Sequence, residues 1–169
     1  MDARRELEHQ IHDYTRALRR YAMVLTRDAD MAEDLVQDTL TKAVAAAEQW
    51  RPGSDLRVWL FRIMHNTHID DRRKSKVRED AKPMLADPVH DEDPTKRIEL
   101  QQVLNALAKL PKAQRDPIVL VALKDMSYSD AARALNVPVG TFFSRLARGR
   151  VALRQLTDGM KTAKLRLVS

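Results

Sequence analysis

Residues 127–150, which read SYSDAARALNVPVGTFFSRLARGR, decide the fold of the back part of this chain. Ser127 opens the stretch in the form of a capping box, which predicts the start of a short helix that ends near Leu135. Asn136 suits the left-handed conformation that follows many helices, and Pro138 forces a restart of the chain. The stretch therefore predicts a short helix, a tight turn and a second helix, which is the helix-turn-helix pattern.

The second helix of this pattern, over about residues 139–156, divides into two faces. Its apolar face, which would dock on neighbouring helices, consists of Val139, Phe142, Leu146, Gly149 and Leu153. The opposite side consists of Ser144, Ala147 and Arg148, with Arg145 on one flank and Phe143 and Arg150 on the other. A helix that enters the major groove needs small or cationic residues on its outer side. Arginine serves both guanine edges and phosphates, and a solvated basic helix in an ordinary bundle is the alternative.

Three helices are predicted in the front half because apolar residues recur there at helical spacing. They cover about residues 7–25, 31–48 and, from a cap at Ser54 or Asp55, on to about residue 73. Trp59 lies on the apolar stripe of the third helix, so we interpret it as a core residue rather than a platform for a stacked base.

Residues 76–96 lose this periodicity and are charged and proline-punctuated, which predicts a flexible linker between two independently packed units. Behind the linker, one helix is predicted to end before Leu110-Pro111 and another to cover about residues 112–124. The predicted fold class is all-α, with two small helical domains at 7–75 and 97–157. The basic tail, 158–169, is expected to be a short helix extension or disordered.

Charge is distributed unevenly along the chain. The net charge is 0 over residues 1–75, −2 over 76–96 and +8 over 97–169, within a total of +6. A strongly basic back half indicates contact with a polyanion, and a soluble protein with a basic surface is the alternative.

The composition excludes several classes of protein. The chain has no cysteine, which excludes disulfides and thiolate metal sites. It has no apolar run of membrane-spanning length and no apolar segment after its charged amino terminus, so we expect neither membrane insertion nor a signal peptide. A cytoplasmic, mostly helical protein is predicted.

Both halves resemble the extracytoplasmic-function (ECF) subfamily of bacterial RNA polymerase sigma factors. In the back half, the stretches that resemble region four of this family are LP at 110–111, QRD at 114–116, SYSDAA at 127–132, VPVGT at 137–141 and SRL at 144–146. In the front half, the stretches that resemble region two are LRRYA at 18–22, AEDLVQD at 32–38 and WLFRI at 59–63, with Asn66 and Asp70. The resemblance covers about residues 14–157 and implies a factor that binds core polymerase and directs it to promoters.

The resemblance also implies which residues serve each partner. Those implied for binding to polymerase are Asp34, Gln37 and Asp38. Those implied for the minus-ten element are Arg62, Asn66, Arg72 and Arg73, with the loop 51–56 holding a flipped-out base. Those implied for the minus-thirty-five element are Thr141, Phe143, Ser144, Arg145 and Arg148. Members of the family are commonly inhibited by an anti-sigma factor in a stress response, so such a partner is expected here.

Two positions depart from the usual family pattern. Phe143 stands where a polar or basic residue is common, and it could touch a thymine methyl, pack on a neighbouring helix or meet an inhibitor. Gly149 replaces a usual alanine and is expected to weaken its helix by about 1 kcal/mol.

Other classes of function fit the sequence less well. His65 and His68 are spaced like metal ligands, but on a helical wheel they lie away from the apolar stripe. Neither this pair nor the similarly spaced His9 and His12 has supporting ligands nearby. No metal or cofactor is therefore expected. No phosphate loop or nucleophile motif indicates an enzyme. A dimeric repressor would leave the front half unexplained. A sigma-like decoy that binds only an anti-sigma factor would not need the arginines of the last helix.

Overall fold

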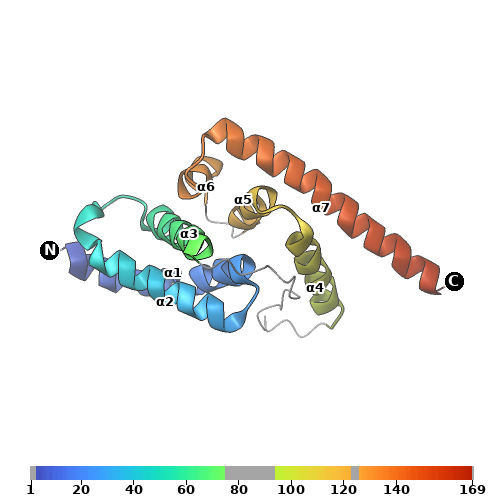
Figure 1. Ribbon diagram of the computed structural model, residues 1–169, viewed down its shortest axis with the longest axis horizontal. Coiled ribbons are helices and arrows are strands. Elements are labelled where there is room, and N and C mark those ends of the chain that lie inside the picture. The colour runs from blue at the N-terminus through green and yellow to red at the C-terminus, as the bar shows by residue number, and fades with distance from the viewer. Residues whose placement is uncertain (1–2, 75–93, 123–125, 169) are drawn as a thin grey trace.

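The computed structural model describes residues 3–74, 94–122 and 126–168, and within these ranges the chain forms helices and no strand. In chain order they are α1 (Ala3–Thr26), α2 (Ala29–Ala45), the 3-10 helix η1 (Ala47–Gln49), α3 (Leu56–Lys74), α4 (Pro94–Lys109), α5 (Lys112–Ala122), α6 (Tyr128–Ala134) and α7 (Val139–Val168). Figure 1 shows α1–α3 together in one half and α4–α7 in the other, with α7 reaching out to the C-terminus. The predicted all-α class is confirmed. None of the described helices is long and apolar enough to cross a membrane.

The front half is a three-helix bundle around buried aromatic rings. Arg27 turns the chain between α1 and α2 with a φ of 56°, and Asp28 then caps α2 by accepting hydrogen bonds from two backbone amides at 3.1 and 3.0 Å. α3 closes the bundle, bringing the ring of Phe61 to 5.3 Å from that of Tyr21. Trp59 is partly buried against the same core, as its place on the apolar stripe predicts.

Helix boundaries in the back half differ from the predicted ones at two places. α4 begins at Pro94, so residues 94–96, assigned to the linker from sequence, are helical. Proline at the first position of a helix loses no hydrogen bond and starts with a suitable φ, which explains the earlier start. α7 continues as one helix to Val168, because residues 157–168 include many strong helix formers and no proline. The remainder of the predicted linker, 76–93, lies outside the described residues.

The two halves pack against each other, and the expectation of independently packed units is wrong. α3 contacts α6, and α1 contacts α5. One continuous buried cluster includes Leu60 and Met64 of α3 together with Leu120 of α5 and Ala131 of α6. Sequence periodicity shows that each helix has an apolar face, but it does not identify the helix that covers that face.

Gly149 lies where α7 crosses α5 at close range. A Cβ atom added there would be 2.6 Å from the backbone oxygen of Gln114 and 2.9 Å from Cδ1 of Ile118. Contacts this short require the backbone of α5 to move. From sequence, Gly149 in place of alanine was expected only to weaken the helix. In the structure, the absence of a Cβ atom at Gly149 is what allows α5 to pack on α7.

Gly149→Ala should lower the free energy of unfolding by about 1–3 kcal/mol, because overpacking against a backbone atom outweighs the gain in helix propensity. Chemical denaturation followed by circular dichroism measures this change. Gly159→Ala is the matched control, since nothing lies within 4 Å of its added Cβ. Equal effects of the two substitutions would contradict the close crossing of α5 and α7.

Candidate nucleic-acid and polymerase interfaces

The helix-turn-helix is formed by α6, the turn after it and the start of α7. The Ser127 hydroxyl accepts a hydrogen bond from the backbone amide of Asp130 at 3.1 Å and donates one to its carboxylate at 2.7 Å. Asn136 takes a φ of 54°, and the amide of Val137 donates to the carbonyl of Ala132 at 3.0 Å, which closes the end of α6. The predicted cap and left-handed turn are both confirmed, and they fix the angle between the two helices.

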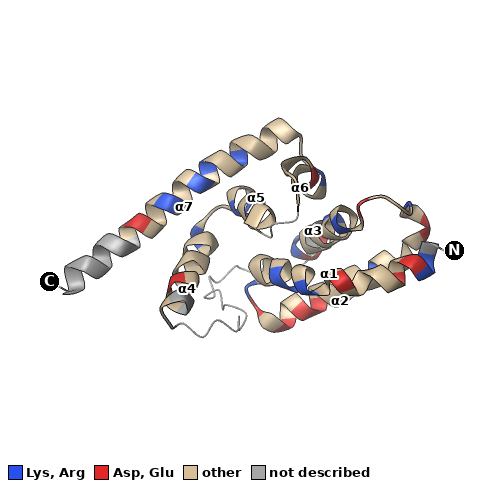
Figure 2. Ribbon diagram, turned by 180° about the vertical axis from the view of Figure 1, so that it is seen from behind, with Lys and Arg blue, Asp and Glu red and all other residues tan. Residues whose placement is uncertain are grey.

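The exposed side of α7 carries a short hydrogen-bonded ladder. The Ser144 hydroxyl donates to the carbonyl of Thr141 at 3.0 Å, and Arg148 donates through Nε to the carbonyl of Ser144 at 3.2 Å. Arg148 also donates through Nη2 to the Ser144 hydroxyl at 3.3 Å, so it lies along its own helix at an exposed position. Figure 2 shows bands of Lys and Arg along α7. This arrangement presents donors that a groove edge or a phosphate can accept.

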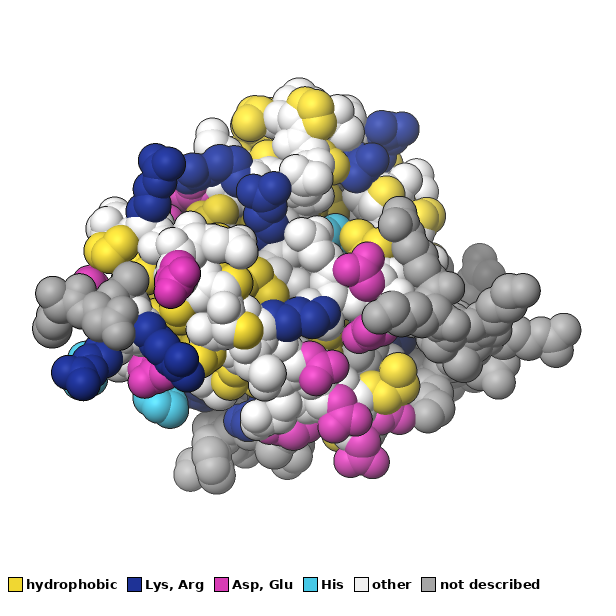
Figure 3. Space-filling view, turned by 60° about the vertical axis from the view of Figure 1, so that its left-hand side comes forward, with side chains coloured by type: hydrophobic (Ala, Val, Ile, Leu, Met, Phe, Trp, Pro, Cys, Tyr) yellow, Lys and Arg dark blue, Asp and Glu magenta, His cyan; other side chains and the backbone are white. Residues whose placement is uncertain are grey.

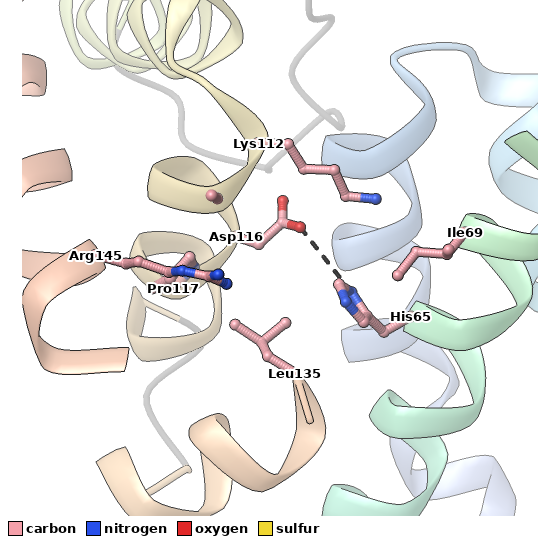
Figure 4. Close-up of a pocket in the computed structure, with 8 residues that line it drawn as sticks. His65, Ile69, Lys112, Asp116, Pro117, Leu135 and Arg145 are labelled. Atoms are coloured by element: carbon pink, nitrogen blue, oxygen red, sulfur yellow. Dashed lines mark ion pairs between the residues drawn. The ribbon is translucent and has the colours of Figure 1, made fainter. Parts of the chain in front are cut away.

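Arg145 differs from the other arginines of α7. It lines a cavity of about 290 Å³ between the two halves, together with His65 and Ile69 of α3, Asp116 of α5 and Leu135 at the end of α6 (Figure 4). The structure thus places Arg145 beside the front half, whereas Ser144 and Arg148 are exposed.

Phe143 lies in a small aromatic cluster. Its ring meets that of Tyr128, from α6, edge to face at a centroid distance of 5.3 Å, and Phe142 beneath them is fully buried. Phe143 remains 45% exposed. Of the three contacts expected for this side chain, packing on a neighbouring helix is present, and it leaves much of the ring open to a partner.

The residues implied for the minus-ten element are only partly brought together. Arg62, Asn66 and Arg72 are exposed on α3, and the side chain of Arg73 lies outside the described residues. The loop 51–56 borders a polar depression that does not include Asn66. This depression therefore does not unite the loop with Asn66.

Two residues of α1 complete the depression beside the loop. Gln10 and Tyr14 line it together with residues 53–57, and the guanidinium of Arg57 lies 5.5 Å from the centre of the Tyr14 ring. Sequence analysis missed both α1 residues, because nothing local in the sequence relates them to a loop that follows forty positions later.

The outer side of α2 carries an acidic surface. Asp34, Gln37 and Asp38 are exposed there, and Glu33 joins them by accepting a hydrogen bond from Gln37 at 3.3 Å. Arg19 of α1 donates to Glu33 at 3.0 Å and lowers the pKa of that carboxyl. Acidic side chains gather over the lower part of the face shown in Figure 3, below a row of Lys and Arg. Met31, which is 57% exposed at the start of the same helix, adds an exposed apolar side chain that sequence analysis missed.

His65 and His68 are buried, although on a helical wheel they lie away from the apolar stripe of α3. Nδ1 of His65 lies 3.4 Å from the Tyr21 hydroxyl and 4.0 Å from a carboxylate oxygen of Asp116. Burial lowers the pKa of His65 to about 4 and that of His68 to about 3, while burial raises the pKa of Asp116 to about 6. α6 packs on a second side of α3, and Asp116 of α5 approaches His65 there, so the buried face of α3 is wider than its apolar stripe. Among the described residues, no group of three or more His, Asp or Glu is arranged to hold a metal ion.

Comparison with known proteins finds relatives for both halves. Residues 11–65 match a family model described as the sigma2 domain of PhyR, and residues 100–153 match sigma-70 region 4. The ECF RNA polymerase sigma factor EcfG of Rhodopseudomonas palustris is 39% identical over 83% of this chain and 78% of its own length. This chain belongs to the ECF RNA polymerase sigma factors.

Other sigma factors support the assignment. SigM of Mycobacterium tuberculosis is 34% identical over 87% of this chain and 74% of its own length. The sigma factor RpoE of Bartonella quintana, solved with the anti-sigma factor NepR, has a TM-score of 0.78 and 32% identity, covering 90% of this chain and 97% of that one. CnrH, solved with the cytosolic domain of CnrY, has a TM-score of 0.68 and 28% identity. In this sigma factor, α1–α3 therefore constitute region two and α4–α7 constitute region four.

Ser127→Ala should lower the free energy of unfolding of the sigma factor by about 1 kcal/mol, because the amide of Asp130 loses its acceptor at the start of α6. Urea denaturation measures the loss. Ser129→Ala, at an exposed position in the first turn of the same helix, is the control and should change stability by no more than about 0.5 kcal/mol. If the two variants were equally stable, the cap would not hold α6 in place.

Proposed function

We propose that this sigma factor binds core RNA polymerase through the acidic outer side of α2, reads the minus-ten element with α3 and the loop before it, and reads the minus-thirty-five element with the start of α7. The observation that carries the proposal is the presence of both sigma regions, in order, with a capped helix-turn-helix whose outer side presents Ser144 and Arg148. The polymerase supplies the chemistry of RNA synthesis, and the sigma factor acts with it in the cytoplasm.

The geometry of α7 supports the proposed reading of duplex DNA. The guanidinium of Arg148 is held by Ser144, so less side-chain freedom is lost when it meets a base edge or a phosphate. Thr141 and Ser144 are short enough to let the helix approach the groove. Arg145 joins this set once the cavity that it lines has opened.

Strand separation at the minus-ten element needs a different surface. Unstacking one base costs a few kcal/mol, which contacts to its edge and ring must offset. The amide of Asn66 offers both a donor and an acceptor, and Arg62 and Arg72 suit the backbone of the opened strand. All three lie on the exposed side of α3.

An anti-sigma factor is the proposed regulatory partner in a stress response. The structurally similar sigma factor RpoE was solved with the anti-sigma factor NepR, and CnrH, which is also structurally similar, was solved with the cytosolic domain of CnrY. Here the exposed apolar residues Ile98, Leu100 and Val103 on α4 supply contact area that a protein partner could cover.

Run-off transcription tests the proposal directly. Purified core polymerase is incubated with fragmented DNA from the source genome, with this protein added or omitted. Discrete transcripts that share upstream sequences are expected only when the protein is present. If no transcript forms and the polymerase binds nothing, DNA binding by the protein alone would support a repressor, and its absence would support a decoy.

Asp34→Lys and Asp38→Lys should each weaken binding to core polymerase by about tenfold or more, since each loses a charge-assisted hydrogen bond and adds repulsion. Fluorescence titration at low and high salt measures the effect, which should shrink as salt rises. Glu48→Lys makes the same change of charge at an exposed position on η1 and should alter affinity by less than about twofold. Equal losses in all three variants would indicate only a general charge effect.

Phe143 should contact a thymine methyl group in the minus-thirty-five duplex. Replacing that thymine by deoxyuridine removes one methyl, and affinity should fall by about fourfold, equivalent to about 0.8 kcal/mol. Phe143→Ala should bind both duplexes equally. Ile98→Ala, which removes an exposed apolar side chain from α4, should keep the fourfold difference. A difference that survives in Phe143→Ala would assign the methyl contact to another residue.

A further inference from the structure

The boundary between the two sigma regions contains a set of buried polar groups, which we call the interdomain seam. It consists of His65 and His68 on α3 and of Arg115 and Asp116 on α5, each less than a tenth exposed. Asp116 lies 3.7 Å from Nε of Arg115 within its own helix and 4.0 Å from Nδ1 of His65 across the boundary (Figure 4). Region two and region four therefore meet at a titratable pair rather than at apolar side chains alone.

The polar groups of the seam are incompletely satisfied. Among the described residues, Nε2 of His68, Nε of Arg115 and Oδ1 of Asp116 are buried and have no hydrogen-bond partner. The cavity beside them is lined partly by Ile69, Pro117 and Leu135. Separation of the two regions would let water hydrogen-bond to these atoms, which favours separation. The seam therefore offsets part of the free energy that apolar burial contributes to holding the regions together.

The packed arrangement cannot serve both promoter elements at once. Elements centred near minus ten and minus thirty-five are separated by roughly 25 base pairs, or about 80 Å of duplex. Here α3 packs directly on α6, and α6 is joined to α7 by a tight turn. Arg145 also lines the cavity and is only partly exposed to solvent. The structure is a closed form that has to open before α3 and α7 reach their separate elements.

We propose that the interdomain seam, through His65, His68 and Asp116, is a proton-sensitive latch that sets the balance between this closed form and an open, promoter-competent form. That the chain has to open in order to bind a promoter rests on the proposed function. The ratio of open to closed molecules, in contrast, is a property of the free chain.

The sign of the response follows from the number of protons that each form binds. Between about pH 6 and pH 4.5 the closed form binds about one proton, shared by Asp116 and His65, because burial raises the pKa of Asp116 to about 6. In the open form both imidazoles return to their ordinary pKa and bind two protons, while Asp116 is mostly ionised in water. Opening therefore takes up about one proton, and acid favours the open form by about tenfold per pH unit.

Other charged groups surround the seam. Lys112 on α5 and Arg72 on α3 face Asp116 and the histidines, and Arg145 faces the cavity from α7. The Tyr21 hydroxyl contacts His65 from α1, and burial raises its pKa well above the usual value, so it stays neutral. These groups set the position of the balance, and the histidines and Asp116 set its dependence on pH.

Single-molecule energy transfer in the full chain tests the latch. Because the chain has no cysteine, Thr41→Cys on α2 and Gln155→Cys on α7 provide two unique and exposed labelling sites. In the parent chain, the ratio of open to closed molecules should rise about tenfold from pH 6 to pH 5. Circular dichroism at each pH verifies that the helices remain folded.

Two seam variants give distinct expected results. His68→Leu removes one proton of uptake and an unpaired nitrogen, so its ratio of open to closed molecules should be nearly independent of pH and lower than that of the parent at pH 7.5. Adding His65→Asn should reverse the response, with acid closing the chain by about fivefold from pH 6 to pH 5, because only Asp116 then binds a proton. His12→Leu, at an exposed position on α1, should behave like the parent.

The outcomes separate this inference from the proposed function. The same pH response in the parent and both seam variants, or no open population at any pH, would overturn the latch. At pH 7.5, where unfolding by acid is not a concern, His68→Leu has to be more closed than the parent for the latch to stand. Run-off transcription is measured separately, so a chain that opens as expected yet yields no transcript would contradict the promoter function and not the latch.

Discussion

The burial of α5 depends on how one charged pair is accommodated. Arg115 and Asp116 are adjacent in sequence and almost fully buried, and an isolated charge in that environment would cost several kcal/mol. Their proximity offsets part of this cost within a single helix, and His65 approaches the carboxylate from the other half. Because α5 contacts α1, α6 and α7, its placement determines how α7 lies relative to region two.

Features that depend on neighbours in sequence could be predicted from sequence. The Ser127 cap, the left-handed Asn136 and the restart at Pro138 each act within a few residues, so the helix-turn-helix follows from local chemistry alone. The acidic side of α2 and the exposed side of α7 could also be predicted, because helical spacing fixes which residues share a face. The family resemblance then supplied roles for these faces that spacing could not provide.

Features that depend on distant parts of the chain could not be predicted. α6 packs on α3 and Asp116 of α5 approaches His65, so His65 and His68 are buried although they lie away from the apolar stripe of α3. Gly149 has meaning only when the backbone of Gln114 approaches it from another helix. The depression beside the loop 51–56 includes Tyr14 for the same reason. In each case the contact joins segments that are far apart in the sequence, and no local sequence pattern predicts that they meet.

Arg145 and Arg148 show how the local and distant constraints meet on one helix. Arg148 is oriented by Ser144 one turn before it, so its geometry is the same wherever region four lies. Arg145 faces a cavity that region two completes, so its availability depends on the relative placement of the two halves. A ligand that binds only the open form has an apparent affinity reduced by the fraction of molecules that are open. On the proposed function, promoter affinity is therefore the product of a local reading surface and an interdomain equilibrium, and the proposed latch at the interdomain seam acts on the second factor without altering the first.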